Sequence, residues 1–100
     1  MTVMILERVS PSVRGDLSRW MIEVKAGVFV GRLSGLVRDN LWSRCLKLAR
    51  DDDGTILQIW TTNNEQGFDL RAHNPRGRIP VLHEDVWLVL VPAPDPRFEP

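Results

Sequence analysis

The stretch VRGDLSRWMIEVKAGVFVGRLS, from Val13 to Ser34, decides the fold of this chain. It combines a basic turn, an amphipathic segment, a glycine break and a short apolar strand. The segment TVMILERV that precedes it is rich in strong β-formers and indicates a first strand. Together the two stretches predict a β-α-β unit that places Glu7 and Arg14 at one end of a sheet.

The first helix is expected to begin after Ser10, a good N-cap residue, with Pro11 in its first turn. It is expected to end at Ala26-Gly27, before the short strand VFVG. Apolar residues at helical spacing support that length: Val13, Leu17, Trp20, Met21 and Val24.

The rest of the chain predicts a second helix and further strands. In order, these are a helix from Ser34 to about Arg50, a turn over 51–54, a strand from Thr55 to Thr62, a hairpin loop over 63–67, a strand from Phe68 to His73, a polar loop from His73 to Arg78, and a last strand from Val86 to Val91. This order favours an α+β, ferredoxin-like sandwich, an antiparallel sheet with two helices on one face, plus a C-terminal strand. We expect a single domain over 1–92 and a proline-rich tail over 93–100.

Composition limits the class of protein. The 100 residues carry 13 basic and 13 acidic side chains, so the formal net charge is +0, which leaves room only for a local basic patch. Cys45 is the only cysteine; it suits a reducing, cytoplasmic setting, and its apolar helix stripe predicts a buried small hydrophobe. No apolar run approaches the roughly 20 residues of a membrane span, so we expect no membrane partner.

Three arginines are candidates for binding nucleic acid. Arg14 falls in the first turn of the first helix, where exposed N–H groups also favour phosphate. Arg76 and Arg78 flank Gly77 in the polar loop, and arginine forks bind phosphate at two points. The alternative is scattered surface arginine, which any domain carries. The four tryptophans are interpreted as core or interface residues rather than platforms for base stacking.

Glu7 follows the first apolar strand and is the candidate catalytic and metal-binding residue. Doubled across a dimer axis, its carboxylate could hold Mg²⁺ and stabilise a phosphodiester transition state. The alternative is a solvated residue at a strand end, paired with Arg8. No second acidic residue lies close by in the sequence to complete a metal site.

Four stretches resemble the CRISPR-associated core protein two family, in its type I-E subgroup, the small subunit of the spacer-acquisition complex. They are ERVSPSVRG, RWMIEVKAGVFVG, WTTNNEQGFDL and NPRGRIPVLHEDVWLVLVP, and the resemblance that they carry extends over nearly the whole chain, from Met4 to about Val91.

The resemblance implies a homodimer flanked by the integrase subunit, CRISPR-associated core protein one. The dimer would hold the protospacer duplex during spacer acquisition, with arginines at the positions of Arg14 and of Arg76 and Arg78 as a phosphate clamp. That structural role requires no cofactor. Related members are metal-dependent endonucleases with an aspartate at the end of the first strand, where this chain has Glu7. Mg²⁺-dependent cleavage through Glu7 is therefore the alternative function.

Overall fold

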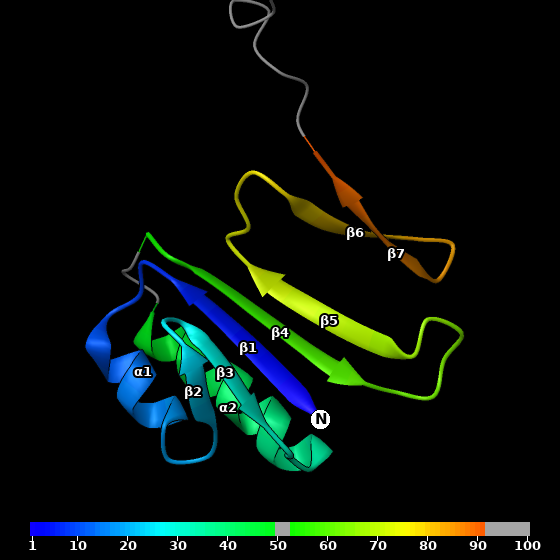
Figure 1. The fold of residues 1–100 in the computed structure, drawn as a ribbon. Helices are drawn as coiled ribbons and strands as arrows, with labels where there is room; N and C mark the ends of the chain where they lie inside the picture. The colour runs from blue at the N-terminus through cyan, green and yellow to red at the C-terminus, as the bar shows by residue number, and fades with distance from the viewer. Residues whose placement is uncertain (50–52, 92–100) are drawn as a thin grey trace, which may run out of the picture.

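The computed structural model describes residues 1–49 and 53–91. Figure 1 shows a five-stranded sheet with two helices against one of its faces, followed by a separate two-stranded hairpin. The elements are β1 (Thr2–Glu7), α1 (Pro11–Leu17), β2 (Ile22–Lys25), β3 (Val28–Gly31), α2 (Gly35–Leu48), β4 (Thr55–Thr61), β5 (Phe68–His73), β6 (Ile79–His83) and β7 (Val86–Leu90).

The large sheet has the strand order β2-β3-β1-β4-β5, and each neighbouring pair is antiparallel. Its first four strands with α1 and α2 make the ferredoxin-like β-α-β-β-α-β arrangement, which confirms the predicted fold class. Side chains alternate between the two faces of a strand, so Met4 and Leu6 of β1 point to the helices while Ile5 and Glu7 point away.

The core lies between the sheet and the two helices. Its fully buried side chains come from the central strands and from both helices: Met4, Val13, Leu17, Phe29, Cys45 and Ile56. Cys45 is buried, as predicted, and its burial raises the pKa of the thiol to about 12. At neutral pH the thiol therefore stays protonated and behaves as a small apolar side chain.

The first helix is shorter than predicted. It ends at Leu17, and Ile22–Lys25 forms β2, which pairs with β3 across the Ala26-Gly27 turn. The prediction failed because IEVK also alternates apolar and polar residues, as an edge strand does, and pairing with β3 satisfies its backbone groups. Trp20 and Val24, expected on the buried helical face, are 51% and 62% exposed.

The second helix agrees with prediction at its start. Ser34 is the N-cap, and its Oγ accepts a hydrogen bond of 3.2 Å from the Val37 N–H. The helix ends at Leu48; the predicted end at Arg50 and the turn residues Asp51 and Asp52 lie outside the described residues. The strands expected from Thr55 and Phe68 are confirmed as β4 and β5.

The predicted C-terminal strand is one half of a hairpin. β7 pairs with β6, a strand that the sequence analysis did not assign, since residues 79–85 were given no element. Pro80 is tolerated because β6 has a strand on one side only. Glu84 and Asp85 both have positive φ, as a two-residue type I′ turn requires. The predicted tail, 93–100, lies outside the described residues.

Side chains rather than a strand ladder attach the hairpin to the large sheet. Gln66, in the β4–β5 loop, accepts from the Trp87 backbone N–H at 2.7 Å and donates to the Trp87 carbonyl at 3.1 Å. The Trp87 indole N–H also donates to Asp69 Oδ1 at 2.8 Å. Both faces of the hairpin carry exposed apolar side chains, including Leu82, Leu88 and Val89.

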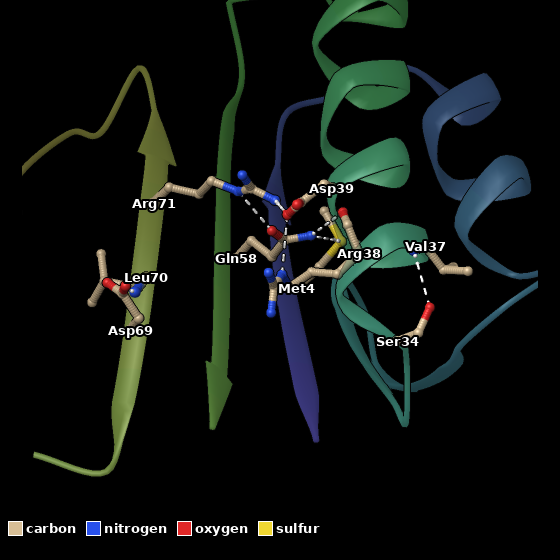
Figure 2. A network of polar contacts seen from close by, with 9 residues as sticks. All are labelled: Met4, Ser34, Val37, Arg38, Asp39, Gln58, Asp69, Leu70 and Arg71. Carbon is tan, nitrogen blue, oxygen red and sulfur yellow. Dashed lines mark hydrogen bonds and ion pairs between the residues drawn. The ribbon is translucent and has the colours of Figure 1, made fainter. Parts of the chain in front are cut away.

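A polar cluster joins α2 to β4 and β5 (Figure 2). Gln58, which is fully buried, donates to the Arg38 carbonyl at 3.1 Å and accepts from Arg71 Nε at 2.8 Å. Arg71 also donates to Asp39 at 2.8 Å. Two tryptophans stack on these arginines: Arg38 lies 4.4 Å from the Trp60 ring centre, and Arg71 lies 5.1 Å from both Trp42 and Trp60. Trp42 and Trp60 therefore serve packing.

Hydrogen bonds from Arg71 and then Arg38 lower the pKa of Asp39 below its ordinary value of 3.8. Because the folded-state pKa is depressed, the pairing stabilises the fold above that ordinary value and is lost as the pH falls through the folded-state pKa.

Neither helix in the 1–49 and 53–91 segments has the length and apolar character that crossing a membrane demands.

Candidate nucleic-acid interface

The end of β1 at Glu7, here called the Glu7 end of the sheet, brings several predicted residues together. A hollow of about 330 Å³ opens there on the sheet face that the helices leave uncovered. Its lining is an apolar floor with a polar rim: Ile5, Glu7, Thr55, Leu57, Ala72, Pro75, Arg76, Gly77, Arg78 and Pro80. Glu7, Arg76 and Arg78 thus share one site, although 69 residues or more separate Glu7 from the arginines in sequence.

Local hydrogen bonds fix the loop that carries Arg76 and Arg78. Thr55 Oγ1 donates to the Asn74 carbonyl at 2.7 Å, and Asn74 Nδ2 donates to the Gly54 carbonyl at 3.1 Å. Gly77 has φ +75°, so the turn between the two arginines uses a conformation that favours glycine. The loop is therefore anchored to the start of β4, beside Glu7.

Arg14 reaches the same end of the sheet from α1. Its Nη2 lies 3.7 Å from Glu23 Oε2, and that carboxylate accepts a 2.8 Å hydrogen bond from the Gly27 N–H. The Gly27 carbonyl in turn accepts from the Leu6 N–H at 2.7 Å, one residue before Glu7. The structure therefore places Arg14 and Glu7 at one end of the sheet, as the sequence predicted.

A second ion pair holds α1 in position. Asp16, only 9% exposed, accepts two hydrogen bonds from Arg44 of α2, at 2.6 and 3.0 Å. This two-point bond fixes the helix that carries Arg14 against the longer helix. Sequence reasoning missed the pair, because the two residues are 28 positions apart and neither belongs to a motif.

Carboxylates accompany two of the arginines. Arg76 pairs with Asp53 as Arg14 does with Glu23, whereas Arg78 makes no ion pair with the described part of the chain. Of the residues that the structure describes, Glu7 is the one carboxylate that lines the hollow. No group of three or more His, Cys, Asp or Glu side chains among residues 1–49 and 53–91 is arranged to hold a metal ion.

A family comparison agrees with this architecture. The family model described as CRISPR-associated protein (Cas_Cas2CT1978) matches residues 1–88, which include both helices and nearly every strand. The chain therefore belongs to the CRISPR-associated Cas2 family.

Proposed function

We propose that this chain is the structural, DNA-binding subunit of a type I-E spacer-acquisition complex. The observation that carries the proposal is that Arg76 and Arg78 line one hollow with Glu7, while Arg14 of α1 lies beside the Gly27 turn at the same end of the sheet. Membership of the Cas2 family supports a CRISPR-associated role.

The arginines suit contact with a phosphate backbone rather than with bases. All three lie on the surface of short elements, and none stands on a helix long enough to enter a groove and read base edges. Guanidinium forks on a loop and on a short helix can each grip a phosphate of either strand. Binding would therefore be strong at low salt and indifferent to sequence.

A homodimer would cover the sheet face opposite the helices. That face is largely apolar and only half-buried, with contributions from the three central strands and the edge strand β5: Val3, Ile5, Val28, Val30, Leu57, Ile59 and Leu70. A second copy seated there would bury this surface and bring two sets of arginines onto one duplex. The exposed apolar hairpin, β6–β7, then remains available for the partner copy and for the integrase, CRISPR-associated core protein one.

The dimer is tested by light scattering. The purified chain should have twice its 11.4 kDa mass at micromolar concentration, and Leu57→Glu, on the open face, should shift it to monomer. Glu65→Gln, a change in an exposed loop, is the control and should stay dimeric. A monomeric wild-type chain would contradict the dimer.

The phosphate clamp is tested by substitution. Arg14→Ala and Arg78→Ala should each weaken binding of a blunt duplex by about tenfold at low salt, because each removes a phosphate contact. Each should also flatten the dependence of log K on log salt by about one unit. Fluorescence anisotropy with two unrelated duplex sequences measures both quantities.

Arg32→Ala supplies the matched control. Arg32 is an exposed arginine next to Gly31, which pairs with Thr2 at the opposite end of β1. Its loss should change affinity much less than the loss of Arg78. If Arg78→Ala altered the preference between the two sequences, base readout would replace backbone contact as the mode of binding.

Cleavage through Glu7 stays the alternative prediction. Mg²⁺ would be held by the Glu7 carboxylate and its copy in the dimer, and would act on the phosphodiester. Incubation of DNA or RNA with Mg²⁺ and purified protein tests it: cleavage lost in Glu7→Ala favours the nuclease, and cleavage that persists excludes Glu7 as its source.

A further inference from the structure

Two of the three candidate arginines are already paired in the free chain. Glu23 lies against Arg14, and Asp53 bonds Arg76. Arg78 makes no ion pair among the residues described. Of the three candidate arginines, a duplex that approaches the Glu7 end therefore meets one without a carboxylate partner among the described residues and two that a carboxylate occupies.

Backbone contacts hold the Glu23 carboxylate and fix the chain next to Asp53. Glu23 is fixed by its hydrogen bond from the Gly27 N–H, in the tight turn between β2 and β3. Asp53 directly precedes Gly54, where the chain runs so close to β1 that an added Cβ would lie 2.5 Å from the Glu7 carbonyl oxygen. The fold thus fixes the Glu23 carboxylate and the chain position of Asp53, whose exposed carboxylate bonds Arg76.

We infer that Glu23 and Asp53 compete with DNA phosphates for Arg14 and Arg76, and so set the affinity of the clamp. The inference rests on the function proposed above. Duplex phosphates bind these two arginines only by displacing the carboxylates, which are then left facing a polyanion.

The competition weakens binding without blocking it. Arg14 and Arg76 have side chains 43% and 44% exposed, and ion pairs at such exposed positions are weak. A phosphate offers the same charge with more acceptor oxygens, and duplex binding also releases counterions. The carboxylates therefore lower the affinity of each arginine for a DNA phosphate by a modest factor. They also reduce the net number of counterions that duplex binding releases.

The test neutralises each carboxylate while keeping its shape. Glu23→Gln retains an oxygen that accepts the Gly27 N–H, and Asp53→Asn retains the shape of the loop side chain. Each should tighten binding of a labelled blunt duplex about two- to fivefold at low salt, and the double variant about tenfold. The slope of log K against log salt should steepen in both.

Glu65→Gln is the matched control for net charge. Glu65 is an exposed acid in the β4–β5 loop, at the end of the sheet away from Glu7. Glu65→Gln should change the affinity for the duplex less than twofold. The inference falls if Glu23→Gln and Asp53→Asn tighten binding no more than this control.

A double-mutant cycle assigns the effect to the pair. In an Arg14→Ala background, Glu23→Gln should give no more than the control gain; a full gain there would overturn the competition. If wild-type chain binds duplex and Arg14→Ala weakens it while Glu23→Gln changes nothing, only this inference falls. If neither wild-type chain nor the double variant binds duplex, the proposed function falls with it. Circular dichroism melting checks that every variant is folded.

Discussion

Gly27→Ala should destabilise this domain by about 3 kcal/mol or more, a large part of the total for a chain of this size. Gly27 has φ +79°, which an L side chain rarely adopts, and an added Cβ would lie 2.4 Å from the Leu6 carbonyl oxygen. The positive φ and the Leu6 carbonyl oxygen are both features of the backbone, which no side-chain movement can relieve. The turn between β2 and β3 must therefore move away from β1 to admit the methyl group. Urea denaturation followed by circular dichroism measures the loss.

Substitutions at two other glycines separate the cost of the positive φ from the cost of the close contact with Leu6. Gly67 has φ +81° with nothing within 4 Å of an added Cβ, so Gly67→Ala should show the conformational cost alone, about 1 kcal/mol. Gly15 lies within α1 with open space around it, and Gly15→Ala should be neutral or stabilising. If Gly27→Ala cost no more than Gly67→Ala, the close approach to Leu6 would not matter.

Arg71→Ala should cost about 2–3 kcal/mol of stability. The substitution leaves the oxygen of the buried Gln58 without a donor, which is the largest part of the loss, and removes the stacking on Trp42 and Trp60. Asp39 also loses the hydrogen bond that does most to lower its pKa. Arg71→Lys should recover only part of the loss, because an ammonium lacks the planar fork that spans Gln58 and Asp39.

A second substitution identifies the unpaired amide as the main cause. Gln58→Leu removes the polar group that Arg71 satisfies, so adding Arg71→Ala to it should cost clearly less than Arg71→Ala alone. Denaturation of the four proteins of this cycle gives the coupling. If the stability losses of Arg71→Ala and Gln58→Leu simply add in the double variant, the hydrogen bond between Arg71 and Gln58 does not contribute to stability.

The fold class followed from sequence because the strong signals were local. Runs of β-forming residues in β1 and β4, alternation in β5, and the Ser34 cap each specify their element within a few residues. Errors fell where two patterns compete. Residues 20–25 satisfy both a helical and a strand period, and pairing with β3 decides between them. The strand β6 was not assigned at all; it contains Pro80, which is tolerated because β6 pairs with a strand on one side only.

The site could be predicted in part. Glu7, Arg14, Arg76 and Arg78 were chosen as candidates because turns and strand ends mark them in sequence, and their roles stay predictions. Their partners Glu23 and Asp53, and the Asp16–Arg44 bond, depend on contacts between elements that no spacing encodes. The same holds for Gln58, a polar residue within an apolar strand, whose partners come from α2 and β5.

The hairpin contributes no side chain to the buried core within the described residues, where the last core residue is Ile56 of β4. Substitutions in β6 and β7 therefore leave the packing of the core intact. Selection on these residues acts through the surfaces that the hairpin contacts. A lineage can exchange Leu82, Leu88 or Val89 to follow a changing partner while the ferredoxin-like part stays constant. The two regions of this small chain are free to evolve at different rates.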